Sequence, residues 1–251
     1  MPDTTAPRGK WGVLVPASNT VVEPELNTLR PTGLSFMASR IINDDMTKFA
    51  QNFEEFLDLS VRALEPAVRA IMKASPDYMI IGYSGIGWKT GADDSVRRRL
   101  KDLSGIGVTT PGSAFLAALK HLGLKTIAII SPYPVDFLSA VDRFFVESGH
   151  PVARHIRVPC ATAIEIANVS ERTLIDAVHD ADGEDVDAIV QVGGNLPMLP
   201  VAETCERWLG KPVLSMSSVL LWHALRSNGL ADVIEGGGML LTRRPTDTLA
   251  A

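Results

Sequence analysis

The chain reads YMIIGYSGIGW over residues 78–88, a short apolar run that passes directly into a glycine-rich loop. A second apolar run followed by glycines, AIVQVGGNLP, occurs over residues 188–197. A short apolar run that ends in turn-forming glycines is typical of a buried strand in a parallel sheet. Glycines, a serine hydroxyl and unpaired backbone N–H groups in such a loop are suited to holding an anion. The two stretches therefore predict two similar strand–loop units, each with an anion-binding loop.

The rest of the chain repeats this alternation of strand-like and helical patterns. Eight apolar runs are separated by helical spacing, which is typical of parallel sheets covered by helices. We expect an α/β fold with two pseudo-symmetric lobes, each a mostly parallel sheet flanked by helices. Residues 1–115 plus 216–251 would form the N-terminal lobe and residues 116–215 the C-terminal lobe. The predicted strands are Trp11–Pro16, Leu34–Ile41, Tyr78–Gly82, Gly107–Thr110, Thr126–Ser131, Val152–Val158, Ala188–Val192 and Val213–Ser215.

Helix boundaries follow from a few residues. Phenylalanines and leucines at near-helical spacing predict a helix over Lys48–Lys73, with a kink or break at Pro66. Gly123 is placed to end one helix and Ser170 to cap the next one at its N-terminus. Because ligands of open α/β sheets bind beyond the carboxyl ends of strands, we expect the active site in the cleft where the two glycine-rich loops face each other.

Composition excludes several functional classes. The chain has 251 residues, of which 46% are hydrophobic, so it is long enough for a sizeable core. Its net charge of −5 offers no basic surface for nucleic acid or an anionic membrane. No stretch approaches the roughly 18 apolar residues of a membrane span, and the first residues do not resemble a signal peptide. We expect a cytoplasmic protein with neither a nucleic-acid nor a membrane partner.

The two cysteines give no sign of a disulfide framework or a metal site. Cys160 and Cys205 lie far apart, without a second cysteine or histidine at metal-ligand spacing. Free cysteines in such positions usually behave as small buried apolar residues. Neither a P-loop nor the glycine spacing of a dinucleotide site occurs, so we expect no bound metal and no cofactor.

Four stretches together carry a family resemblance. VPASNTVVEPE at residues 15–25 looks like the opening of maleate cis–trans isomerases. The loop at residues 83–91, Ser131-Pro132-Tyr133, and the loop at residues 192–196 are similar in order and spacing to arylmalonate decarboxylase. The chain thus resembles this branch of the aspartate/glutamate racemase superfamily. The resemblance implies two pseudo-symmetric α/β lobes with the active site between them.

The resemblance assigns a carboxylate-binding set. Ser84 and the N–H of Gly85 match hydroxyl positions of the decarboxylase's dioxyanion hole, Tyr133 matches its tyrosine, and Gly194 matches a backbone donor. Asn19 matches a substrate-binding asparagine of the isomerase, and with Asn195 it would bind a second polar group. Such donors would also stabilise the enediolate formed when a bond alpha to the carboxylate breaks, and one donor contributes roughly 3 kcal/mol.

The chain departs from the family at the proton carriers. Where the resemblance implies two acid–base cysteines, this sequence has Tyr83 in the first loop and Gly193 in the second. A two-thiol racemase and a covalent thiol route of isomerisation are therefore disfavoured. Tyr83 is either an acid that protonates an enediolate or a ring that fills the vacated space. Lys89, Asp93 and Asp94 follow the first loop and either reach the cleft or form the first turn of the next helix.

The sequence therefore predicts a cofactor-independent enzyme that acts on a small carboxylate or dicarboxylate, like a decarboxylase or a cis–trans isomerase but without the cysteine pair. Two alternatives stay open. One is a hydrolase of a cyclic imide, lactone or amide, with Ser84 or water as the nucleophile and His223 as the candidate base. The other is a binding protein that kept the carboxylate pocket and lost the chemistry. An even-numbered homo-oligomer is the default expectation for such a domain.

Overall fold

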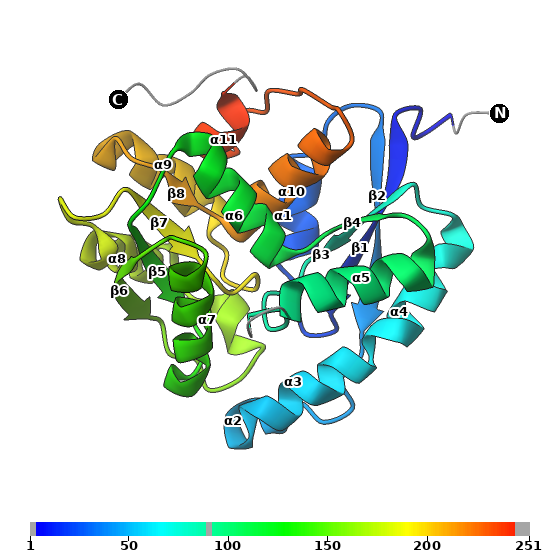
Figure 1. The fold of residues 1–251 in the computed structure, drawn as a ribbon, viewed down its shortest axis with the longest axis horizontal. Coiled ribbons are helices and arrows are strands. Elements are labelled where there is room, and N and C mark those ends of the chain that lie inside the picture. The colour runs from blue at the N-terminus through cyan, green and yellow to red at the C-terminus, as the bar shows by residue number, and fades with distance from the viewer. Residues whose placement is uncertain (1–3, 89–91, 244–251) are drawn as a thin grey trace.

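The computed structural model describes residues 4–88 and 92–243, which form two four-stranded sheets (Figure 1). The strand order is β2-β1-β3-β4 in the first sheet and β6-β5-β7-β8 in the second. All neighbouring strands run parallel. In both sheets the second strand along the chain lies at one edge and the first strand lies beside it, so the two sheets share one topology. The predicted α/β fold with two pseudo-symmetric lobes is confirmed.

All eight predicted strands are present, β2 with the predicted ends and the others with one end shifted by one or two residues. The strands are β1 (Gly9–Pro16), β2 (Leu34–Ile41), β3 (Tyr78–Ile81), β4 (Gly107–Thr109), β5 (Ile127–Ser131), β6 (Val152–Arg157), β7 (Ala188–Gln191) and β8 (Val213–Leu214). The helices are α1 (Val22–Thr28), α2 (Lys48–Gln51), α3 (Phe53–Arg62), α4 (Leu64–Ile71), α5 (Ala92–Ser104), α6 (Pro111–Leu122), α7 (Val135–Glu147), α8 (Glu171–Ala181), α9 (Leu199–Leu209), α10 (Met216–Ser227) and α11 (Gly238–Thr242). Two 3₁₀ turns, η1 (Met72–Ala74) and η2 (Glu165–Asn168), complete the described elements.

Local chemistry explains where the helices begin and end. The Ser170 hydroxyl accepts a hydrogen bond from Thr173 N at 3.2 Å, and Gly123 ends α6 with a φ of +69°, as predicted. The helix predicted over residues 48–73 is divided at Asn52 and Ala63 into α2, α3 and α4. The break predicted at Pro66 lies instead at Ala63, because Pro66 occupies the first turn of α4, where a missing N–H leaves no helical hydrogen bond unmade.

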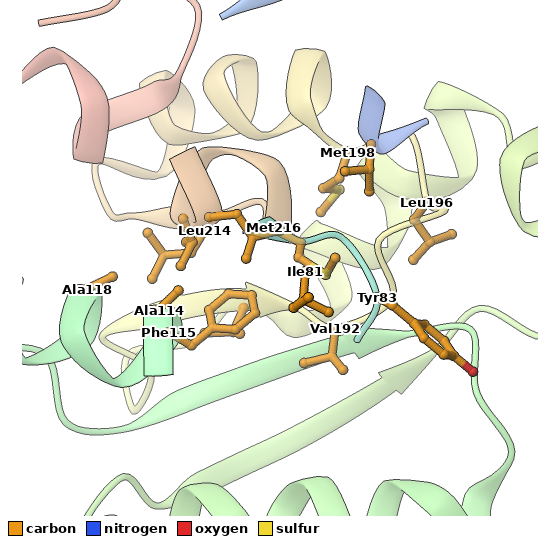
Figure 2. Packing of buried hydrophobic residues seen from close by; sticks show 14 of the residues in the cluster. Ile81, Tyr83, Ala114, Phe115, Ala118, Val192, Leu196, Met198, Leu214 and Met216 are labelled. Atoms are coloured by element: carbon orange, nitrogen blue, oxygen red, sulfur yellow. The ribbon is translucent and has the colours of Figure 1, made fainter. Parts of the chain in front are cut away.

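The core joins the two lobes directly behind the loops. Figure 2 shows Ile81 at the end of β3 packed near Val192, which follows β7, and near Met216 at the start of α10. Gly82 is required at this junction, since a Cβ there would lie 2.7 Å from side-chain atoms of both Val15 and Val22. The ends of β3 and β7 are thereby held at fixed positions relative to each other.

The last helices of the chain, α10 and α11, pack against elements of both sheets. α10 packs against α6, β3 and β4, and α11 packs against α9, α10 and β8. The proposed lobe boundaries at 115/116 and 215/216 stay a prediction. Within residues 4–88 and 92–243, no helix has the length and apolar character needed to cross a membrane.

Candidate active site

The two glycine-rich loops meet at a small cavity beyond the carboxyl ends of β1, β3, β5 and β7. Its volume is about 30 Å³, which is enough to hold water. Every predicted site residue except Gly85 and Gly193 contributes to its wall. The lining residues are Pro16, Ser18, Asn19, Phe49, Phe56, Gly82, Tyr83, Ser84, Tyr133, Ala163, Ile166, Gly194 and Asn195. No lysine, arginine or histidine is among these residues, so within residues 4–88 and 92–243 the hydrogen-bond donors of the cavity wall are neutral.

Ser84 lies at the centre of the site, because it contacts groups from both lobes. Its Oγ accepts a hydrogen bond from the backbone N–H of Gly194 at 3.3 Å and lies 3.1 Å from the Tyr133 hydroxyl. Ser84 follows β3, Tyr133 follows β5 and Gly194 follows β7, so three strand ends bring these donors together. Ser84 is fully buried, and Arg157 holds the Tyr133 backbone by donating from Nε to its carbonyl at 3.1 Å.

Ser84 and Tyr133 are here called the hydroxyl pair, and one of their two hydroxyl hydrogens is not used in the bond between them. Each hydroxyl carries one hydrogen, and only one of the two can lie between the oxygens. The other is left for a ligand whichever residue is the donor. Burial raises the pKa of Tyr133 to about 12, and the hydrogen bond with Ser84 opposes that rise. The pair is therefore a neutral donor near pH 7, suited to stabilising negative charge on a ligand oxygen.

Tyr83 lines the same cavity with its ring, but its hydroxyl is bonded elsewhere. The phenol donates a hydrogen bond to Ser60 Oγ on α3 at 3.3 Å. Ser60 Oγ also accepts from Asn43 Nδ2 at 3.0 Å and donates to the Phe56 carbonyl at 2.9 Å. Burial, and secondarily the nearby Tyr133, raise the pKa of Tyr83 far above its ordinary value of 10. Tyr83 is therefore a neutral phenol at the edge of the cavity.

The two glycines outside the cavity wall lie directly behind it. Gly85 lines a neighbouring cavity of about 230 Å³, and a Cβ on it would lie 2.3 Å from the Tyr83 ring. Gly193 has a φ of +136°, and a Cβ there would lie 2.4 Å from Cδ of Pro132. Both positions support the site through the backbone, and neither has room for a side chain.

The two asparagines organise the loops around the cavity. Asn19 Oδ1 accepts from the backbone N–H groups of Val21 and Val22, which shapes the first turn before α1. Asn195 reaches across the lobe interface, where its Oδ1 accepts from Thr20 N at 3.0 Å and its Nδ2 donates to the Ala163 carbonyl at 2.9 Å. The structure thus places both asparagines at the cavity and gives each a structural role beside any contact with a ligand.

Two carboxylates, the buried Asp93 and the half-buried Glu25, anchor the helices that surround the loops. Asp93, 7% exposed, accepts from Thr110 Oγ1 and from the N–H groups of Gly112 and Ser113 at the start of α6. It neither reaches the cavity nor lies in solvent, because it caps a neighbouring helix. Asp94 is exposed and pairs with Arg97, as expected for a first helical turn, while Lys89 lies outside the described residues.

Glu25 is the second anchor, and it links α1 to the segment that follows the second loop. It accepts from Leu199 N at 3.0 Å and from the Ser217 hydroxyl. Burial raises its pKa to about 7, and these two hydrogen bonds oppose the rise. The sequence quoted for the family resemblance includes Glu25, but nothing in it identified this anchoring role.

The hydrolase alternative receives no base from this geometry. His223 Nδ1 lies 2.8 Å from Thr109 Oγ1, outside the cavity lining, and burial lowers its pKa to about 4. Cys205 is buried on α9 and Cys160 is half-buried beside the Val158 carbonyl, so neither lines the cavity. Within the described ranges, no cluster of three or more His, Cys, Asp or Glu side chains is placed to hold a metal ion.

Sequence reasoning missed several site residues, among them Phe49, Phe56, Ser60 and Asn43. The phenylalanines have the spacing of an apolar helical face, which indicates burial without indicating what they cover. Ser60 and Asn43 lie in segments with no motif, and only the packing of α3 against the first loop brings them to Tyr83.

Comparison with known proteins identifies relatives along almost the whole chain. A family model described as arylmalonate decarboxylase matches residues 11–241. The chain is 25% identical over 242 residues to the maleate isomerase of Geobacillus stearothermophilus, covering 92% of this chain and 96% of that protein. It is 26% identical over 228 residues to the arylmalonate decarboxylase of Bordetella bronchiseptica, covering 87% and 90%.

Solved structures show the same fold. A maleate isomerase variant from Pseudomonas putida S16, crystallised with maleate, superposes with a TM-score of 0.84 at 23% identity and covers 93% of this chain and 97% of its own. An arylmalonate decarboxylase structure gives a TM-score of 0.76 at 24% identity, with 92% and 98% covered. The two-lobed α/β architecture is therefore common to all three proteins.

Proposed function

The chain belongs to the arylmalonate decarboxylase family, and on that premise we propose that it is a cofactor-independent enzyme that makes or breaks a bond alpha to a small carboxylate. The reaction is decarboxylation of a malonate-like acid or isomerisation of an unsaturated diacid. The relatives are named for these two activities. The cysteine pair implied by the family resemblance is replaced here by Tyr83 and Gly193.

The observation that supports this proposal is the meeting of Ser84, Tyr133 and the Gly194 N–H in one buried cavity. Ser84 Oγ lies 3.1 Å from the Tyr133 hydroxyl and 3.3 Å from Gly194 N. We propose that the hydroxyl pair donates its remaining hydrogen to one substrate carboxylate, and that the N–H groups of Gly194, which donates to Ser84 Oγ here, and of Gly85 complete the oxyanion pocket. Asn19 and Asn195 are proposed to bind a second polar group at the same cavity, and Gly193 to shape the loop.

The chemistry follows from where negative charge develops. When a malonate-like acid loses carbon dioxide, the electron pair of the broken C–C bond moves onto the remaining carboxylate and forms an enediolate. Fixed hydrogen-bond donors stabilise this species more than the starting carboxylate, because its oxygens carry more charge. A proton delivered to the alpha carbon completes the reaction. Tyr83 either delivers this proton or only walls the pocket.

The cavity must enlarge to admit such a substrate. A volume of about 30 Å³ holds water, and we propose that it is smaller than a carboxylate with a side group needs. Phe49 and Phe56 are the lining side chains contributed by α2 and α3, outside both sheets. We propose that movement of these two rings makes room for the substrate.

Replacement of Ser84 and Tyr133 tests the proposal. Turnover of phenylmalonate and of maleate is followed by proton NMR in deuterium oxide, which reports carbon dioxide loss, isomerisation and deuterium uptake at the alpha carbon. We expect Ser84→Ala to lower kcat by about 100-fold or more, the loss typical for one oxyanion-hole donor. Tyr133→Phe is expected to act in the same direction.

Matched controls remove similar groups away from the cavity. Ser39→Ala deletes a hydroxyl that bonds the Ala67 carbonyl, and Tyr78→Phe deletes one that contacts Thr109. Both controls should retain full turnover. Undiminished turnover in Ser84→Ala and Tyr133→Phe would contradict the proposed oxyanion pocket. Binding of either acid without any chemical change would favour a binding protein.

A further inference from the structure

We propose that Ser60 is a positioning residue that turns the Tyr83 hydroxyl away from the hydroxyl pair, so that Tyr83 walls the pocket with its ring and gives no proton to the substrate. The inference rests on the proposed function, and it decides between the two roles left open for Tyr83. It assigns a purpose to a part of α3 that no motif in the sequence marks.

Ser60 has no remaining hydrogen-bonding capacity for another partner. A serine hydroxyl offers one hydrogen and two acceptor positions. The hydrogen is donated to the Phe56 carbonyl at 2.9 Å, and the acceptor positions receive the Tyr83 phenol at 3.3 Å and Asn43 Nδ2 at 3.0 Å. Asn43 also donates to the Phe56 carbonyl at 2.8 Å, so Ser60 is held from two sides. The only hydrogen of the Tyr83 phenol is therefore committed to Ser60.

The ring of Tyr83 is confined on its other side as well. The backbone of Gly85 lies so close that a Cβ would be 2.3 Å from Cε2 and 2.7 Å from the hydroxyl oxygen. Figure 2 shows Tyr83 at the edge of the buried cluster with its hydroxyl pointing away from Ile81 and Val192. Swinging the hydroxyl into the cavity requires the bond to Ser60 to break while the ring turns past this backbone.

Proton donation by Tyr83 would also leave a buried phenolate that its hydrogen-bond partners cannot reprotonate. Its hydrogen-bond partner is Ser60, whose own partners are an asparagine amide and a backbone carbonyl, and none of these groups supplies protons near neutral pH. Burial disfavours the phenolate further. The proton that quenches the enediolate comes instead from a water molecule, which the same buried hydroxyl pair can hold by a hydrogen bond.

A double-mutant cycle separates positioning from proton donation. The variants are Tyr83→Phe, Ser60→Ala and their combination, with Tyr78→Phe as the control for loss of a buried phenol hydroxyl elsewhere. Phenylmalonate and maleate are the turnover probes, and urea unfolding measures the same cycle without a ligand. Tyr83→Phe keeps the ring, so kcat should fall by less than about fivefold, whereas loss of a general acid typically costs at least about 100-fold.

Ser60→Ala frees the phenol hydroxyl, which then competes with the substrate carboxylate for the hydroxyl pair. We expect KM to rise about fivefold, the equivalent of one net hydrogen bond. In the Tyr83→Phe background this rise should vanish, because no hydroxyl remains to compete. In urea, the double variant should lower the unfolding midpoint by less than the sum of the single variants. Tyr78→Phe should show no such coupling with Ser60→Ala.

Three results would overturn the proposal: a loss of about 100-fold in Tyr83→Phe, a KM effect of Ser60→Ala that persists without the phenol hydroxyl, or additive unfolding midpoints. The last result would mean that Tyr83 and Ser60 are not bonded. Failure of the proposed function is distinguishable, because it would appear as absent turnover in the unmodified protein. The unfolding cycle would then decide the role of Ser60 by itself.

Discussion

The two glycine-rich loops occupy equivalent places in the two sheets, yet one contributes mainly side-chain atoms to the candidate site and the other mainly backbone atoms. The first loop supplies side chains: Ser84 reaches into the cavity, Tyr83 walls it, and Trp88 is buried with its indole N–H bonded to the Ser84 carbonyl. The second loop supplies backbone, since Gly194 contributes an N–H and Gly193 has no room for a side chain. The strand order that the two sheets share thus determines where each loop lies, but not which of its atoms face the cavity.

The difference has a physical cause in the backbone of the second loop. Gly193 combines a φ of +136° with close contact to the Pro132 ring, which cannot rotate away. The loop therefore excludes a cysteine at this position by geometry as well as by sequence. At Tyr83 no such restriction exists, and the space is filled by a ring instead.

Gly193→Ala should give the largest effect. The added Cβ meets Pro132 at 2.4 Å and imposes a rarely allowed φ, so we expect the free energy of unfolding to fall by about 3 kcal/mol or more. Gly229→Ala is the matched control, because Gly229 also has a positive φ, +69°, with nothing within 4 Å of the added Cβ. Urea unfolding should show a loss of only about 1 kcal/mol for the control. Equal losses would mean that backbone conformation alone, and not the contact with Pro132, restricts the second loop.

Sequence reasoning recovered the features that depend on local patterns. Apolar runs followed by glycine identified β3 and β7, and two similar lobes that face each other would put both loops on one cleft, so Ser84 and Gly194 could be placed together. Tyr133 followed from the family resemblance rather than from any pattern. The contact of Ser84 with Gly194 across the lobes is the structural outcome of these predictions.

What sequence reasoning missed depends on contacts between segments far apart in the chain. Ser60 reaches Tyr83 only because α3 folds over the first loop, and Pro132 blocks Gly193 only because the ends of β5 and β7 are adjacent. Asp93 could not be recognised as the cap of α6, since a carboxylate that lies one helix away from the N–H groups it accepts from has no local signature. Such partners are determined by packing, which periodicity does not encode.

Asn195→Ala tests how the second loop is attached to the first lobe, and its expected effect is the next largest. The amide accepts from Thr20 N at a half-buried contact and donates to the buried Ala163 carbonyl, so its loss removes both bonds and leaves that carbonyl unpaired. We expect the free energy of unfolding to fall by about 2 kcal/mol. Asn27→Ala removes an exposed amide that bonds the Glu23 carbonyl and should cost far less. A similar small loss at both positions would show that the second loop is held by its backbone packing alone.

Glu25→Gln tests the anchor behind the second loop through pH. Burial raises the pKa of Glu25 from its ordinary 4.5 to about 7, so between these values the folded protein keeps a proton that the unfolded chain has released. The free energy of unfolding therefore falls as pH rises through this range. Relative to the wild type, Glu25→Gln should gain about 1 to 2 kcal/mol between pH 5 and pH 7, as measured by urea unfolding.

Glu23→Gln is the matched control for this pH effect. Glu23 lies on the same helix, but its carboxylate pairs with Arg40 at the surface. The free energy of unfolding of Glu23→Gln should change with pH as that of the wild type does. If that of Glu25→Gln does so too, the Glu25 carboxylate is not desolvated by the contact with Leu199 and Ser217, and the second loop lacks the buried anchor that the first has in Asp93.

The smallest expected effect belongs to Gly194→Ala, one residue beyond Gly193. A Cβ there would lie 2.3 Å from Cε of Met216, the flexible end of a side chain that can move aside, and 3.1 Å from Val22. We expect a loss of about 1 kcal/mol, at the lower limit for overpacking. Shortening Met216 to valine should relieve it, so the alanine should cost less in that background. A loss as large as that of Gly193→Ala would mean that the whole second loop, and not one strained position in it, excludes side chains from the site.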